Sequence, residues 1–202
     1  EKPIRVRRAN GGFLSEKGIN IDMTPVKSGE RYFYVWSHRK NIGTPLDTGS
    51  MLMIAEFDPV HPERLISEPK CLSRPLYGFE NTEHTINNEG PYAFYYNNKI
   101  YLAYSGGDAR GYLYAIGMLT ANDGDDLCDL SVWEKAKTPI ASFATIPGEY
   151  GPGHNSFFWD RDQNLWIAYH AVTSFEEKIV SSGMRRVYFE QDKTPRFDVI
   201  VE

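Results

Sequence analysis

Three short segments of this chain repeat one pattern at nearly constant spacing. Each begins with turn-forming residues and continues with alternating aromatic and branched side chains, as the second strand of a β-hairpin does; they are residues 29–37, 97–105 and 162–171. Their equivalent aromatic residues, Trp36, Tyr104 and Tyr169, lie 68 and 65 residues apart. Because a fixed period of tens of residues is typical of repeat architectures, the chain is expected to stack similar β-units side by side.

Further strands are expected between these hairpins, at residues 50–57, 111–120 and 184–190. Twelve prolines and seventeen glycines interrupt every long helical window, and one short helical turn is expected within residues 124–135. About four strands per repeat match the blade of a β-propeller, in which small sheets pack face to face around an axis. A β-sandwich with coincidental spacing is the alternative. With either fold, residues 1–202 are expected to form a single all-β domain, which in a propeller would be a partial one.

The charge and composition exclude some partners. The formal net charge of −5 argues against nucleic-acid binding, and the basic residues at 5–8 are interpreted as a solvated terminus. No apolar run has the length of a membrane-spanning helix, and the charged first residues lack the core of a signal peptide. Cys71 and Cys128 show no metal-binding spacing, so the sequence leaves open whether they pair.

The repeat makes three polar residues comparable. Asp22, Glu89 and His154 stand 14 or 15 positions before the three equivalent aromatic residues, and each precedes or begins an expected strand. The first strand of every propeller blade lines the central channel. We therefore expect these three side chains to converge at one end of the axis, although they are far apart in the sequence.

Two carboxylates and an imidazole in one pocket suit acid–base chemistry. Cleavage of a glycosidic bond needs a carboxylic acid that protonates the leaving oxygen and a carboxylate partner. Glu89 fits the acid, because nearby aromatic residues and a charged Asp22 would both favour its protonated form. The alternative for each carboxylate is a role as an ordinary surface or capping group.

Sugar rings stack on aromatic side chains, and 14% of the residues are aromatic. Most of them must belong to the core. Phe79 and Tyr150 lie in expected loops ahead of Glu89 and His154, so they are the candidates for contacts with a sugar; a structural role is the alternative for both. His170 is interpreted as a hydrogen-bonded core histidine. The acidic stretch 122–129 lacks a complete set of calcium ligands and is interpreted as a surface turn.

An ordered set of longer motifs then points to one family. "NIDMTPVKSGERYFYVWS", "NEGPYAFYYNNKIYLAYS", "YAIGMLTANDGDDLCDLSVWEK" and "YGPGHNSFFWDRDQNLWIAYHA" follow one another along the chain. Together they resemble glycoside hydrolase family 43, the five-bladed propeller arabinofuranosidases and xylosidases. The resemblance covers nearly the whole chain.

The resemblance implies roles for three residues and a setting for the protein. Glu89 would be the general acid, and Asp22 would tune its acidity and orient it. His154 would lie on the axis, contact the substrate and hold water or a calcium ion. No cofactor would be required for the reaction, an inverting hydrolysis of a carbohydrate. Secretion or export to the periplasm is implied, whereas the choice between arabinose, xylose and galactose linkages is left open.

The general base of this family is a third carboxylate in the first blade, ahead of Asp22. The residues before Asp22 contain no aspartate, and Glu16 lies in no matching strand. We therefore expect the chain to supply roughly blades two to five, to lack the first blade with the base, and to be poorly active until that segment completes the ring. A carbohydrate-binding propeller without catalysis is the alternative function.

Overall fold

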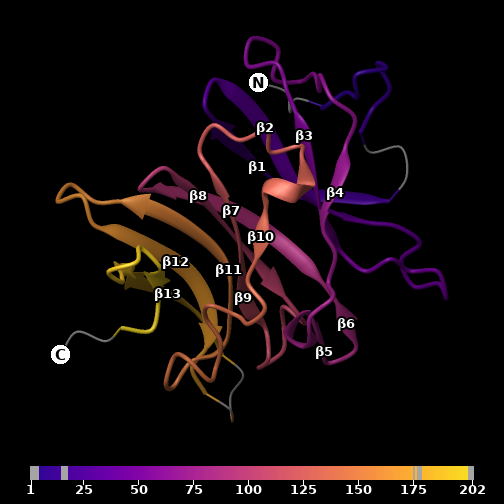
Figure 1. The fold of residues 1–202 in the computed structure, drawn as a ribbon. Helices are drawn as coiled ribbons and strands as arrows, with labels where there is room; N and C mark the ends of the chain where they lie inside the picture. The colour runs from indigo at the N-terminus through magenta and orange to yellow at the C-terminus, as the bar shows by residue number, and fades with distance from the viewer. Residues whose placement is uncertain (1–4, 15–17, 175, 177–178, 200–202) are drawn as a thin grey trace.

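The computed structural model describes residues 5–14, 18–174, 176 and 179–199, and within these ranges it contains strands and two 3-10 turns but no α-helix. Figure 1 shows three antiparallel sheets that follow one another like a fan, from the first at the top to the third at the lower left. The expected all-β architecture is confirmed. No helix within the described ranges is long and apolar enough to cross a membrane.

Each sheet is a meander of strands in sequence order. The first sheet contains β1 (Ile19–Ser28), β2 (Arg31–Arg39), β3 (Met51–Glu56) and β4 (Lys70–Ser73). The second contains β7 (Asn88–Tyr96), β8 (Lys99–Gly106), β9 (Ala115–Asn122) and β10 (Glu134–Lys135). The third contains β11 (Tyr150–Trp159), β12 (Leu165–Val172) and β13 (Val180–Arg186). The repeated segments thus become β2, β8 and β12, each the second strand of its sheet.

Smaller elements connect or extend these sheets. Two ribbons pair β5 (Asn81–Thr82) with β6 (Thr85–Ile86), and β14 (Tyr188–Phe189) with β15 (Pro195–Arg196). The 3-10 turns are η1 (Gly78–Glu80) and η2 (Leu130–Val132). The second of these lies inside the stretch where a helical turn was expected, and Asp129 caps it by accepting a hydrogen bond from the Ser131 N–H.

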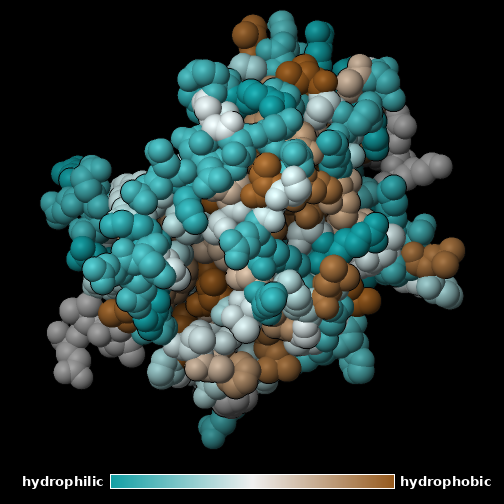
Figure 2. Space-filling view, viewed as in Figure 1, coloured by the Kyte–Doolittle hydropathy of each residue, from teal (hydrophilic) through white to brown (hydrophobic). Residues whose placement is uncertain are grey.

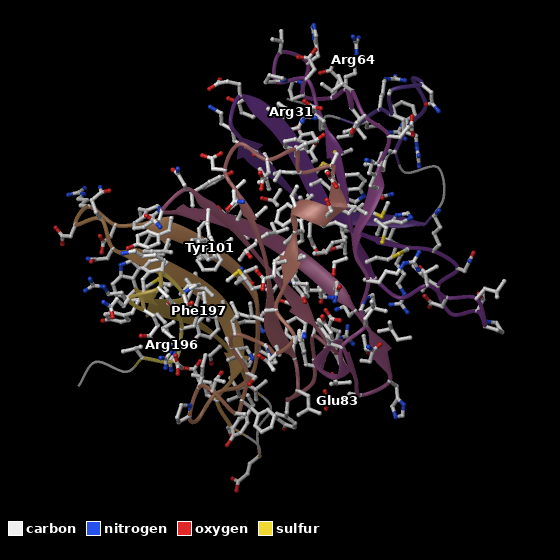
Figure 3. All side chains as sticks on the ribbon, viewed as in Figure 1. Arg31, Arg64, Glu83, Tyr101, Arg196 and Phe197 are labelled. Atoms are coloured by element: carbon white, nitrogen blue, oxygen red, sulfur yellow. The ribbon has the colours of Figure 1, made fainter. Side chains whose placement is uncertain are left out.

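The sheets pack face to face through buried apolar side chains, as propeller blades do. Between the first and second sheets lie Phe33, Ile54, Leu102 and other fully buried residues. Tyr101 and Phe197 belong to the cluster between the second and third sheets, and they lie near each other in Figure 3. Full burial of each large apolar side chain contributes about 1.5–3 kcal/mol, so these contacts hold the sheets in fixed relative positions.

The first strands of the sheets lie nearest the common axis. β7 contacts β1 on one side and β11 on the other. The arc of three sheets therefore brings the beginnings of three inner strands together, as a propeller requires. The face of the molecule in Figure 2 is mostly hydrophilic, with scattered apolar patches. The exposed large apolar side chains of the described residues include Leu46, Leu76 and Met184.

A buried ion pair supports the start of β7. Glu80 is fully buried, and its Oε1 accepts hydrogen bonds from Lys135 Nζ (2.5 Å), Tyr104 OH (2.7 Å) and Asn88 Nδ2 (2.9 Å). Asn88 is also fully buried, and its Oδ1 accepts a hydrogen bond of 2.8 Å from Ser73 of the first sheet. These bonds anchor the residue that directly precedes Glu89.

His38 makes the stability of the first sheet depend on pH. This histidine is buried, and its Nδ1 lies 3.0 Å from the Ile19 carbonyl oxygen and 2.8 Å from Asn20 Oδ1. Burial is the main cause that lowers its pKa below the ordinary 6.5. In the window between this lowered pKa and 6.5 the unfolded chain binds more protons than the folded one. Stability should therefore be complete above pH 6.5 and decrease as the pH falls through that window.

Urea unfolding of the wild type and of His38→Gln at pH 7.5, 6.5 and 5.5 measures this effect. The wild type should lose more stability between pH 7.5 and 5.5 than the variant does, because the variant lacks the titrating ring. Equal losses in the two proteins would show that His38 does not contribute to the pH dependence.

Candidate active site

The inner strands are irregular at the same point in each sheet. Each inner strand pairs with the second strand of its own sheet, and the register of this pairing shifts after Ile21 in β1, after Glu89 in β7 and at Gly153 in β11. The next residue in each case has a left-handed backbone, with φ of 55° at Asp22, 58° at Gly90 and 50° at His154. A bulge of this kind bends its strand and changes the direction of the side chains that follow it.

The bulges correct the expected equivalence of the three polar residues. Ile21 pairs with Ser37, Glu89 with Ser105 and Gly153 with His170, so these are the corresponding positions. Asp22 and His154 therefore correspond to Gly90, and Glu89 lies one residue earlier. Asp22 and Gly90 both stand 14 positions before the repeated aromatic residue of their sheets, whereas His154 stands 15 positions before it because the third hairpin has a longer turn. A spacing of 14 or 15 residues therefore admitted Glu89 in place of Gly90.

Asp22 connects the three sheets. Its Oδ2 accepts a hydrogen bond of 3.1 Å from the Gly90 N–H and one of 3.3 Å from Ser37 Oγ. Its Oδ1 lies 3.8 Å from His154 Nε2. Gly90 has a left-handed φ of 58°, which glycine adopts without strain, and a Cβ there would lie 3.4 Å from the His154 ring. The predicted convergence of the inner-strand starts is therefore observed for Asp22, His154 and the peptide that follows Glu89.

Glu89 is half-buried beside these residues. Its Oε1 accepts a hydrogen bond of 2.7 Å from the hydroxyl of Tyr114, which is fully buried just before β9. Burial, and then the charge of Glu89, raise the pKa of Tyr114 well above its ordinary value. Tyr114 is therefore a neutral hydrogen-bond donor at physiological pH.

The two histidines of the third sheet differ in their surroundings. The His154 side chain is 48% exposed, and its backbone N–H donates a hydrogen bond of 2.7 Å to Ser105 Oγ. His170 is half-buried, and its ring stacks on Tyr114 with 5.6 Å between centroids. Its Nδ1 has no hydrogen-bond partner among the described residues, so the expectation of a hydrogen-bonded core histidine is wrong for this nitrogen. Burial lowers the pKa of His170, and the neighbouring His154 lowers it further.

A cavity of about 210 Å³ lies where the three strands meet. Asp22, Thr24, His154 and Asn155 contribute polar groups to its lining. Asn155 is only 5% exposed, yet neither its amide oxygen nor its amide nitrogen has a partner among the described residues. The described ranges contain no cluster of three or more His, Cys, Asp or Glu residues suited to a metal ion.

The two aromatic candidates occupy different positions. Phe79 lies in η1 and is half-buried against the cluster between the first and second sheets, with its ring 6.4 Å from that of Tyr77. Tyr150 begins β11, and its ring meets that of Tyr112 edge to face at 6.0 Å. The expected loop position is therefore wrong for Tyr150, which lies at the site end of an inner strand, whereas Phe79 packs against the core cluster.

Three neighbours of the site are absent from the residues that the sequence indicated. Tyr114, Ser37 and Ser105 stand in ordinary strand contexts, and only the folded structure brings them to Glu89, Asp22 and His154. Ser37 and Ser105 do end the repeated segments 29–37 and 97–105. Comparison of the repeats could therefore have indicated the two serines, but not Tyr114.

The fold and the site together define a class of protein: a β-propeller whose inner strands bring Asp22 and His154 to an axial cavity, with a second carboxylate, Glu89, one residue before the cavity-lining Gly90. The profile of the family "Glycosyl hydrolases family 43" matches residues 6–195, and the chain belongs to that family. The resemblance inferred from the motifs is thereby confirmed.

Named relatives agree with this assignment. The chain is 28% identical over 94% of its length to the extracellular exo-alpha-(1->5)-L-arabinofuranosidase of Streptomyces avermitilis, and 35% identical over 76% to that of Streptomyces chartreusis. It spans 41% and 45% of the lengths of these two proteins. Among solved structures, the α-L-arabinofuranosidase of Lactobacillus brevis superposes with a TM-score of 0.76 at 28% identity, over 89% of this chain and 55% of that one.

Proposed function

We propose that this chain is part of a glycosidase that cleaves arabinofuranosyl linkages, with Glu89 as the general acid. The observation that carries the proposal is the Asp22 carboxylate bound to the Gly90 N–H, which places it one peptide from Glu89 beside the axial cavity. The names of the Streptomyces and Lactobacillus relatives support arabinofuranosides over xylosides as the substrate class.

In this proposal the Glu89 carboxyl protonates the glycosidic oxygen as the bond to the anomeric carbon breaks. Asp22 fixes the backbone after Glu89, and its negative charge opposes a second negative charge nearby, which favours the protonated acid. Tyr150 stands at the site end of β11, where a ring can contact the sugar; a similar contact is proposed for Phe79.

Inversion also requires a base that activates water on the other face of the sugar. We propose that an aspartate outside residues 1–202 supplies it, within a segment that completes the propeller. Two observations support this: the chain spans less than half of its curated relatives, and a hollow of about 600 Å³ lies along the third sheet beside His154, His170 and the 65% exposed Met184.

The axial cavity is proposed to hold water or a hydrated calcium ion. Asp22 and Asn155 offer oxygen atoms there, which fits a cation that keeps most of its water, since calcium takes six to eight oxygen ligands. No cofactor takes part in the proposed reaction. We further propose export from the cell, as the names of both Streptomyces relatives state for those proteins. Metal analysis and cell fractionation of the full-length protein check these two points.

Assays of the full-length protein on an aryl α-L-arabinofuranoside and an aryl β-D-xyloside test the proposed activity. We expect turnover of the arabinofuranoside with release of the inverted anomer, followed by proton NMR, and little turnover by the 202-residue chain alone. If the full-length protein binds arabinose oligosaccharides in calorimetry but hydrolyses no pentoside, it is a carbohydrate-binding propeller instead.

A further inference from the structure

The aromatic ring of Tyr114 packs against the third sheet at a point where a glycine leaves space for it. A Cβ on Gly153 would lie 2.1 Å from the Tyr114 ring, and one on Gly151 would lie 3.5 Å from its Cβ. The ring of His170, the residue that pairs with Gly153, stacks on the same tyrosine. Gly153 thus leaves room for the Tyr114 ring, and the stacked His170 ring beside it fixes the position of that ring.

A chain of hydrogen bonds with a fixed direction ends on Glu89. The His154 backbone N–H can only donate, and it donates to Ser105 Oγ at 2.7 Å. The Ser105 hydroxyl is therefore free to donate to the oxygen of Tyr114, with which it forms a side-chain hydrogen bond. The Tyr114 hydroxyl then donates to Glu89 Oε1 at 2.7 Å. Each N–H or O–H group in this series of hydrogen bonds donates to the next oxygen, so Glu89 Oε1 at its end acts as an acceptor.

We propose that Tyr114 is a positioning residue that assigns the transferable proton of Glu89 to Oε2. This inference rests on the proposed role of Glu89 as the general acid. The carbonyl oxygen of a carboxylic acid is a stronger hydrogen-bond acceptor than its hydroxyl oxygen, so the Tyr114 hydrogen bond to Oε1 favours the acid form that carries the proton on Oε2.

The hydrogen bond from Tyr114 also stabilises Glu89 after it has given up its proton. When Oε2–H gives its proton to the glycosidic oxygen, the leaving group departs as a neutral alcohol and Glu89 becomes a carboxylate. Tyr114 keeps its own proton throughout and donates to the new charge, and a hydrogen bond to a charged acceptor is stronger than one to a neutral acceptor. The proton that water loses goes to the separate base.

Tyr114→Phe in the full-length protein tests this role. Phenylalanine keeps the ring in place and removes only the hydroxyl. On an arabinofuranoside with a basic alkyl leaving group, kcat/KM should fall about ten- to a hundredfold, whereas an activated aryl leaving group that needs little protonation should be nearly unaffected. The basic limb of the pH profile should move to higher pH, because the ionised carboxylate loses a donor.

Tyr104→Phe is the matched control. Tyr104 is also fully buried, and its hydroxyl also donates to a carboxylate at 2.7 Å, but that carboxylate belongs to Glu80 in the supporting ion pair. This variant should lose thermal stability without a change in leaving-group dependence or in the pH profile. If Tyr114→Phe loses only thermal stability, as is expected for Tyr104→Phe, then Tyr114 is merely structural and the inference is wrong.

Two further measurements separate this inference from the proposed function. If Glu89→Gln remains fully active on the alkyl substrate, Glu89 is not the acid and both ideas fail. If Glu89→Gln is inactive while Tyr114→Phe shows no selective effect, only the role of Tyr114 fails. Carbon-13 NMR titration of the Glu89 carboxyl needs no turnover: Tyr114→Phe should move its midpoint to higher pH, and an unchanged midpoint would contradict the inference.

Discussion

Glu89→Gln is expected to lower kcat of the full-length protein about 10²- to 10⁴-fold on an alkyl arabinofuranoside, because the amide cannot donate a proton to the leaving oxygen. Glutamine keeps the size of the side chain and can still accept the Tyr114 hydrogen bond at Oε1, so the fold should be retained. Steady-state assays with alkyl and activated aryl substrates measure the effect, which should be much smaller for the aryl substrate.

Glu30→Gln serves as the control for this substitution. Its side chain is 97% exposed in the turn between β1 and β2, 3.9 Å from Lys27. The change removes the same charge far from the axial cavity, so both substrates should be hydrolysed at the wild-type rate. Equal rates for Glu89→Gln and Glu30→Gln would exclude Glu89 as the general acid and favour a role in carbohydrate binding alone.

Lys135→Met is expected to lower the free energy of unfolding by about 3–5 kcal/mol, the usual cost of removing one partner from a buried ion pair. The Lys135 side chain is 16% exposed, and that of Glu80 is fully buried. Without the ammonium group, the Glu80 carboxylate keeps hydrogen bonds from neutral donors only, namely Tyr104, Asn88 and the Tyr77 N–H. Thermal and urea unfolding of the full-length protein measure the loss.

Lys27→Met is the matched control on the surface. Lys27 and Glu30 lie 3.9 Å apart with side chains 46% and 97% exposed, and such pairs contribute about 0–1 kcal/mol. A double variant, Glu80→Gln with Lys135→Met, should recover part of the stability, because no unpaired charge is then buried. A loss in Lys135→Met as small as that in Lys27→Met would show that the buried pair does not support the start of β7.

The strands and their grouping were predictable because they depend on local pattern. Alternating apolar residues after a turn predict a hairpin, and the expected second strands 29–37, 97–105 and 162–171 coincide largely with β2, β8 and β12. The meeting of Asp22 and His154 was predictable for a related reason. Repeats of similar length place their first strands at equivalent positions around the axis, and the structure brings these two side chains to within 3.8 Å.

The contacts around Glu89 were not predictable in this way. Its one-residue offset follows from the strand pairing, because Glu89 pairs with Ser105 whereas Asp22 lies within a bulge, and a bulge leaves no clear mark in a single sequence. Tyr114 lies 25 positions from Glu89 and reaches it across the sheet from a third strand. The ion pair of Glu80 with Lys135 likewise joins η1 to β10 over a long separation in sequence.

The all-β repeat, the family motifs and the three polar residues near the beginnings of the inner strands follow from local propensity and from spacing along the chain. The contacts between particular atoms do not: the Asp22 carboxylate meets the Gly90 N–H, and the Glu89 carboxyl meets the Tyr114 hydroxyl, only in the folded chain. These hydrogen bonds depend on the packing of neighbouring sheets and on local bulges, which bring together residues that are not neighbours in the sequence.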